Sequence, residues 1–139
     1  MGIAVPGAVA ASLAFPDRHV VAVSGDAGFL MNSQEIETAV RLGLRLVVLV
    51  WNDGGYGLIE WKQQIHFQRS AHVRFGNPDL VKYAESFGAR GYRVSSAPEL
   101  LPVLERALAD NAVSIIDCPV DYTENLKLTE RLGEMVCPL

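Results

Sequence analysis

The sequences VVAVSGDAG, residues 20–28, and LVVLVWNDGGY, residues 46–56, decide the fold of this chain. In each, a run of apolar residues leads into glycines and an aspartate, Asp26 in the first and Asp53 in the second. Short apolar runs that end in glycine are typical of strands buried between two layers of helices. We therefore expect two strands of a parallel sheet here, a buried one from Val20 to Ser24 and a central one from Leu46 to Trp51.

Helical patterns alternate with these strands in the first half of the chain. The Ala-rich stretch from Pro6 to Phe15 predicts a helix before the first strand. Asn32 or Ser33 is the predicted N-cap of a second helix, which Gly43 ends; Asn32 and Glu35 have the spacing of a capping box. A helix between two parallel strands is the usual crossover connection.

The second half continues the alternation. Asn77 followed by Pro78 predicts the N-cap and first turn of a helix, and residues 65–76 before it are expected to form a long loop. Later elements are a strand from Tyr92 to Val94, a helix over residues 97–108 opened by Ser96 and Glu99, and a last strand from Val113 to Cys118. The predicted fold class is α/β, a three-layer parallel sheet with helices on both faces.

Composition limits the function classes. The chain has 139 residues, half of them hydrophobic, with 16 acidic and 12 basic side chains and a net charge of −4. This size predicts one domain, residues 1–122, and residues 123–139 are expected to be a C-terminal tail. Without a basic cluster, we expect no nucleic-acid partner and no membrane partner. Two cysteines, Cys118 and Cys137, and no visible export signal favour a cytoplasmic location.

The two aspartates are the candidate chemical groups. Ligands of parallel sheets bind at the carboxyl ends of the strands, so Asp26 and Asp53 are expected to meet if their strands are neighbours. Two carboxylates are hard oxygen ligands suited to Mg²⁺ or Ca²⁺, and the adjacent glycines would let backbone amides approach a phosphate. Either motif alone is also typical of an ordinary turn.

The two motifs, GDAGF and WNDGGYG, resemble the signature of the thiamine-diphosphate enzymes, which begins Gly-Asp-Gly and ends Asn-Asn about one strand-helix-strand unit later. Ala27 replaces the second glycine and Asp53 the second asparagine of that signature. The likeness extends over MGIAVPGAVAASLAFPD, RFGNPDLVKYAESFGA and IIDCPVDY, which are similar to the catabolic acetolactate synthases. The chain thus resembles the C-terminal, diphosphate-binding domain of that family.

This resemblance implies a transferase, a carboligase that condenses two pyruvates to 2-acetolactate and CO₂ with thiamine diphosphate and Mg²⁺, in branched-chain amino acid or acetoin metabolism. It implies that Asp26 and Asp53 bind the metal through their side chains and Gly55 through its carbonyl oxygen. The cofactor-binding residues it implies are these two aspartates with Met1, Gly25, Ala27, Gly28, Gly55, Tyr56 and Leu58. Met1 would hold the cofactor bent, or is simply an initiator methionine.

Two further residues are candidates for substrate contact. Ile59 and Lys62 follow the second motif on a predicted helix, although a solvated lysine is the favoured interpretation of Lys62. The family's catalytic glutamate lies in a domain that this chain does not contain, so the resemblance implies no catalytic residue here. We expect a fragment that lacks the domain's first strand or loop, is inactive alone and exposes apolar surface, and that comes from a homo-oligomeric enzyme, a dimer or tetramer.

Other readings remain open at this point. Within the family, the motifs fit another 2-keto acid decarboxylase or a pyruvate oxidase, which would act on pyruvate or related 2-keto acids. From another class, a Mg²⁺-binding receiver-type signalling module also gathers aspartates at strand ends, but it needs a lysine after its last strand, where Pro119 and Val120 stand. A dinucleotide-binding domain is disfavoured because no G-x-G-x-x-G joins the first strand to its helix.

Overall fold

A computed structural model of the chain describes residues 1–122. The predicted C-terminal tail, residues 123–139, lies outside the described residues. The elements in order are α1 (Ala4–Ala14), β1 (Val20–Gly25), α2 (Asp26–Leu30), α3 (Glu35–Arg41), β2 (Leu46–Asn52), α4 (Gly57–Phe67), α5 (Leu80–Ser86), β3 (Arg90–Arg93), the 3₁₀ turn η1 (Ala97–Glu99), α6 (Leu100–Ala109) and β4 (Val113–Pro119).

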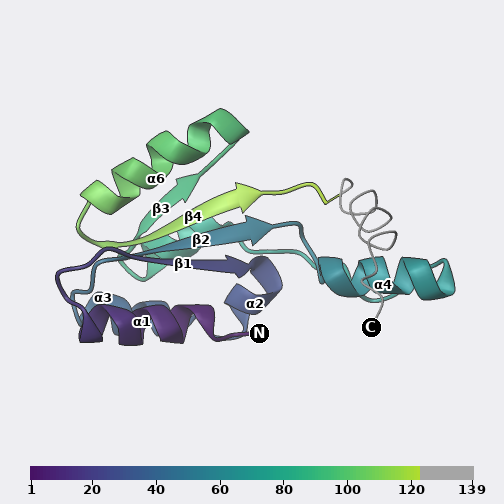
Figure 1. Cartoon of the computed structure of the whole chain (residues 1–139), viewed down its shortest axis with the longest axis horizontal. Helices are drawn as coiled ribbons and strands as arrows, with labels where there is room; N and C mark the ends of the chain where they lie inside the picture. The colour runs from purple at the N-terminus through teal and green to yellow at the C-terminus, as the bar shows by residue number, and fades with distance from the viewer. Residues whose placement is uncertain (123–139) are drawn as a thin grey trace, which may run out of the picture.

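The strands form one parallel sheet in the order β1-β2-β4-β3. Helices α1, α3 and α5 pack on one face and α6 on the other (Figure 1). The predicted three-layer α/β fold is confirmed. Each connection between neighbouring strands crosses over through at least one helix, as parallel pairing requires.

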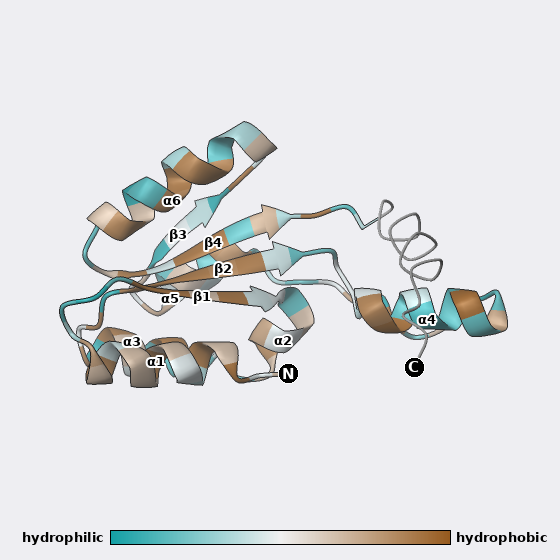
Figure 2. Ribbon diagram, in the orientation of Figure 1, coloured by the Kyte–Doolittle hydropathy of each residue, from teal (hydrophilic) through white to brown (hydrophobic). Residues whose placement is uncertain are grey.

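Strand β2 lies at the centre of the core. Its alternate residues point to opposite faces, so Leu46, Val48 and Val50 pack under α1 and α3 while Val47 and Leu49 pack against α6. All five are buried. This burial on both faces explains the continuous apolar sequence, which Figure 2 shows as a brown band along β2 up to its pale arrowhead.

Strand β1 differs from its prediction as a buried strand. Val21 and Val23 are 42% and 55% exposed, and they lie in register with Val47 and Leu49 of β2. Because β1 is an edge strand, the layer that covers the same face of β2 does not cover it. The apolar run therefore predicted the strand correctly but not its position in the sheet.

Two predicted caps are wrong because the residues have distant partners. Asn32 does not cap α3; its Nδ2 donates to the carbonyl oxygen of Gly2 at 2.9 Å, and Glu35 accepts a hydrogen bond from Thr38 instead. Asn77 does not cap α5. Its neighbour Asp79 does, accepting from the backbone amides of the helix's first turn at 3.0 and 3.2 Å.

Other boundaries shift by a few residues. The helix after the second motif, α4, continues to Phe67, so the long loop predicted from residue 65 begins at Gln68. Strand β3 begins at Arg90, two residues before the predicted start. Ser96 and Glu99 do pair, at 2.8 Å, but they close a 3₁₀ turn before α6.

Helix α4 stands away from the body of the fold at the right of Figure 1. None of its residues is buried, and Leu58, Ile59, Ile65 and Phe67 are exposed. The expectation of exposed apolar surface is confirmed here. Within residues 1–122, no helix combines the length and the apolar composition needed to cross a membrane.

Candidate metal and cofactor site

The carboxyl ends of β1 and β2 bring the two motif aspartates to one edge of the sheet. The strands are parallel neighbours, with Gly25 in register with Trp51. Asp26 begins α2 directly after β1, and Asp53 follows β2 at the start of the loop to α4. The convergence that the spacing predicts is therefore present.

Asp26 is buried, with 2% of its surface exposed, and is surrounded by hydrogen-bond donors. Its Oδ1 accepts from the amide of Ala27 at 2.7 Å, and its Oδ2 accepts from the amide of Gly54 at 2.8 Å and from Asn77 Nδ2 at 2.6 Å. A buried carboxylate is costly unless its oxygens are hydrogen-bonded, and these three bonds satisfy that requirement.

Asp53 is half-buried beside Asp26. Burial raises the pKa of Asp53, and the negative charge of Asp26 raises this pKa further, while Arg74 opposes the shift. Like charges at close range repel, and a cation between them would remove that repulsion. The pair therefore has the electrostatics of a divalent-cation site.

The donor set also fits such an ion. Among residues 1–122 there is no cluster of three or more His, Cys, Asp or Glu side chains, so the remaining ligands would be a main-chain oxygen, water and substrate. Mg²⁺ is usually bound in this way, through one or two carboxylates and phosphate oxygens. Gly55, the implied main-chain ligand, is buried next to Asp53.

Glycines shape the loop after β2. The amide of Tyr56 donates to Val73 at 2.9 Å, and the amide of Phe75 donates to Gly54 at 3.1 Å, so this loop pairs with the segment before α5. A Cβ atom on Gly55 would lie 2.8 Å from the carbonyl oxygen of Val73. The close pairing requires a residue without a side chain at position 55.

Arg74 and Glu60 join the same loop to α4. Arg74 donates to the carbonyl oxygen of Asp53 at 2.6 Å and forms an ion pair with Glu60. Both side chains line the cavity described next. No local sequence pattern links these two residues, because one lies in a loop and the other on a helix.

A cavity of about 930 Å³ opens at this edge of the sheet. Its walls contain every predicted cofactor-binding residue, namely Met1, Gly25, Asp26, Ala27, Gly28, Asp53, Gly55, Tyr56 and Leu58. Ile59 also lines it, whereas Lys62 does not and is exposed. Tyr122 is a lining residue that the sequence did not reveal; burial and the nearby aspartates raise the pKa of its phenol.

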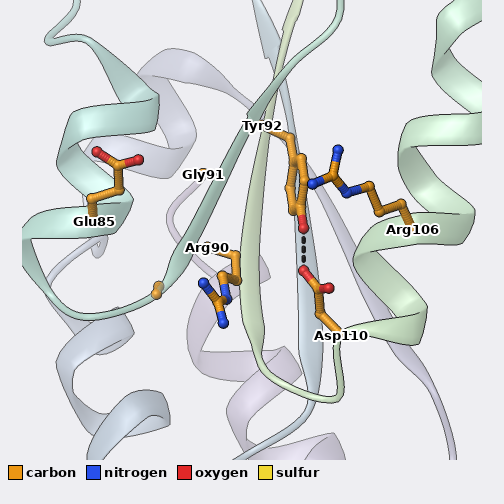
Figure 3. A pocket seen from close by; sticks show the side chains of 7 residues that line it. Glu85, Arg90, Gly91, Tyr92, Arg106 and Asp110 are labelled. Carbon is orange, nitrogen blue, oxygen red and sulfur yellow. Dashed lines mark hydrogen bonds between the residues drawn. The ribbon is translucent and has the colours of Figure 1, made fainter.

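A second, smaller cavity of about 380 Å³ lies near the start of β3, at the opposite end of the strands (Figure 3). Tyr92 donates to Asp110, and the guanidinium of Arg106 lies over the Tyr92 ring, 5.4 Å from its centre. These groups bind one another, and the sequence predicts no site there.

Comparison with known proteins agrees with this geometry. Residues 1–118 match the family model described as thiamine pyrophosphate enzyme, C-terminal TPP binding domain. The chain is 46% identical to an acetolactate synthase of Bacillus subtilis over 98% of this chain and 25% of that protein. It is 44% identical to the catabolic acetolactate synthase of Raoultella terrigena over 95% of this chain and 24% of that protein.

The fold has a solved counterpart. A thiamine diphosphate-dependent 4-hydroxybenzoylformate decarboxylase of Rhodococcus jostii superposes with a TM-score of 0.82 and 28% identity, over 89% of this chain and 24% of that one. The chain thus spans about a quarter of the length of the relatives it matches. The family match decides against the receiver-type and dinucleotide-binding alternatives. This chain belongs to the thiamine pyrophosphate enzymes and corresponds to their C-terminal TPP-binding domain, with the acetolactate synthases among its relatives.

Proposed function

We propose that this chain is the diphosphate- and metal-binding part of an acetolactate synthase, which condenses two pyruvates to 2-acetolactate and CO₂. The observation that carries the proposal is the pair of aspartates at the mouth of a large cavity, on a chain close in sequence to acetolactate synthases. The substrate and the reaction come from those relatives, and the site chemistry comes from the geometry.

In this proposal Asp26, Asp53 and the carbonyl oxygen of Gly55 hold Mg²⁺. Asp26 is fixed by its three hydrogen bonds, whereas Asp53 has the more exposed carboxylate. These residues would supply part of the oxygen ligands of the ion, and water and phosphate oxygens would supply the rest. The ion in turn cancels the repulsion that raises the pKa of Asp53.

The residues at the start of α2 would hold the diphosphate in this proposal. Gly25, Ala27 and Gly28 border the cavity there, and nothing stands within 4 Å of the position that a Cβ on Gly25 would occupy. Tyr56 also lines the cavity. Small residues on one side let backbone amides come close to phosphate oxygens.

When bound, thiamine diphosphate supplies the electron sink for decarboxylation of a 2-keto acid. Met1, Leu58 and Ile59 form an apolar part of the wall, which would contact the apolar parts of the cofactor and the substrate. Lys62 has no part in this proposal because it does not line the cavity.

We further propose that polypeptide outside these residues completes the active site. The relatives are about four times as long as the chain, and apolar residues of α4 at the cavity stay exposed. A dimer or tetramer of the cytoplasmic full-length enzyme would cover them, and the 139-residue chain alone would not turn over pyruvate.

A chimera tests this proposal. The corresponding C-terminal quarter of the Bacillus subtilis acetolactate synthase is replaced by this chain, and acetolactate is measured after incubation with pyruvate, Mg²⁺ and thiamine diphosphate. We expect acetolactate from the chimera, none from its Asp26→Asn variant, and an unchanged yield from the control Tyr83→Phe, which lies away from the cavity. A folded chimera that binds cofactor but forms no acetolactate would contradict the proposal, and so would robust turnover by the 139-residue chain alone.

A second candidate is decarboxylation of a 2-keto acid without carboligation. The superposition on the 4-hydroxybenzoylformate decarboxylase favours it, because the same domain fold there belongs to a decarboxylase. The chimera assay separates the two reactions, since decarboxylation of pyruvate releases acetaldehyde in place of acetolactate. A pyruvate oxidase would instead consume an oxidant.

A further inference from the structure

The side chain of Asn77 lies between the two motifs. Its Nδ2 donates to Asp26 Oδ2 at 2.6 Å and to Asn52 Oδ1 at 2.7 Å. Asp26 follows β1 and Asn52 ends β2, whereas Asn77 comes from the segment before α5. One amide group therefore joins the ends of two strands from a third part of the chain.

The orientation of this amide follows from its neighbours. A primary amide has two N–H donors and one oxygen acceptor. Turning Asn77 over would place its oxygen against two other oxygens, so the nitrogen must face Asp26 and Asn52. Both of its N–H groups are then used, one on each partner.

The hydrogen bonds continue beyond Asn52. Its Nδ2 donates to Asp117 Oδ1 at 2.9 Å, and Asp117 Oδ2 accepts from Arg93 Nε at 3.0 Å. Arg93 also pairs with Asp79 at 3.1 Å. Asp79 is the N-cap of α5 and stands two residues after Asn77, so the network returns to the segment from which it began.

This closed network fixes the segment across the carboxyl ends of the strands. Asp26 and Asp117 are 2% and 3% exposed, and hydrogen bonds between groups shielded from water are costly to leave unmade. The Oδ1 of Asn77 is also buried and has no hydrogen-bond partner.

We propose that Asn77 is a positioning residue for the metal site: its amide holds Asp26 Oδ2 in place beside Gly54 and couples the first motif to the second. The proposal rests on the proposed function, because Asp26 matters as a metal ligand. It assigns Asn77 no contact with substrate. Residues that orient a metal ligand in this way typically change metal affinity 10- to 100-fold when they are replaced.

The test uses two measurements on the 139-residue chain. The first needs no metal: hydrogen exchange at the amide of Gly54, which also donates to Asp26 Oδ2, compared with exchange at the core amide of Val48. The second is the affinity for Mn²⁺ in the presence of thiamine diphosphate, followed by electron paramagnetic resonance. The variants are Asn77→Leu, which keeps the size and removes both donors, and Asn77→Ser, which keeps one donor on a shorter side chain.

The matched control is Tyr83→Phe. It removes a part-buried hydrogen bond with Ser33, 2.8 Å long, and neither residue lines the cavity. A purely structural role for Asn77 would make its variants behave like this control, with lower stability and unchanged affinity.

We expect Asn77→Leu to speed exchange at Gly54 at least tenfold relative to Val48 and to weaken Mn²⁺ binding by about 10- to 100-fold. Asn77→Ser is expected to lie between Asn77→Leu and the wild type, and it decides the outcome if Asn77→Leu does not fold. Unchanged exchange at Gly54 in the folded variants overturns the proposal. Unchanged Mn²⁺ affinity in the folded variants also overturns the proposal for Asn77. A wild-type chain that binds no Mn²⁺ would instead contradict the proposed function, and the exchange rate at Gly54 would then decide the role of Asn77.

Discussion

A substitution at Gly57, the first residue of α4, tests directly how the second motif positions the carboxylate of Asp53. A Cβ atom at position 57 would overlap Oδ2 of Asp53, which is the end of a flexible side chain. We therefore expect Gly57→Ala to displace the carboxylate and leave the backbone in place. The required shift is about 1 Å, several times the roughly 0.2 Å tolerance of metal–ligand distances.

The two consequences of this substitution have opposite signs. Disturbing the placement of a metal ligand typically costs about 10- to 100-fold in affinity, so Mn²⁺ binding should weaken by a factor in that range. Stability should hold or rise by up to about 1 kcal/mol, because alanine is the better helix former. A variant that is folded, at least as stable and defective in metal binding would separate positioning from folding.

The matched control is Gly7→Ala. Gly7 is an exposed residue within α1, and a Cβ there meets nothing within 4 Å. We expect it to gain the same helical stability and to bind Mn²⁺ as the wild type does. Affinity comes from titration followed by electron paramagnetic resonance, and stability from urea unfolding. Wild-type affinity in Gly57→Ala would refute the assignment of the Asp53 carboxylate as a ligand in this position.

Three further predictions concern single groups. Burial and the charge of Asp26 raise the pKa of Asp53. The metal-free wild type should therefore lose stability relative to Asp53→Asn as pH rises from the usual carboxyl range through the raised pKa. Urea unfolding at several pH values measures this loss, which Mg²⁺ should remove. Hydrogen bonds to backbone amides lower the pKa of Asp79. The stability lost in Asp79→Ala should therefore be largest above the usual carboxyl pKa and should vanish as pH falls through the lowered pKa. Equal losses at all pH values would contradict the capping role. Burial, with the charge of Asp117, raises the pKa of the Cys118 thiol, so in a Cys137→Ser chain iodoacetamide should alkylate it far more slowly in the folded state than in urea.

The strands could be predicted from sequence because their apolar character is local. The run from Leu46 to Val50 is buried on both faces, and its composition alone indicates this. The same kind of run in β1 could not reveal that Val21 and Val23 are exposed. Exposure there depends on the order of strands in the sheet, which non-local pairing decides.

The site residues likewise fall into those that the local sequence predicts and those that depend on contacts between distant segments. Asp26 and Asp53 follow strands directly, so the rule for parallel sheets brings them together. The contact of Asn77 with the site was not predicted, because Asn-Pro is also a helix-start signal; the helix is capped instead by Asp79, two residues later. The role of Arg74 could not be predicted from the sequence, because its partners, the carbonyl of Asp53 and the carboxylate of Glu60, lie in other segments.

The most direct test of the central claim is calorimetric titration of the 139-residue chain with thiamine diphosphate, with and without Mg²⁺, in wild type, Asp26→Asn and Asp53→Ala. The account predicts saturable binding at one site per chain that requires Mg²⁺ and weakens on the order of 10²-fold in each variant, because each removes a charged ligand. Binding of equal strength without Mg²⁺, or in both variants, would contradict the claim that the two aspartates hold the diphosphate through a shared divalent cation.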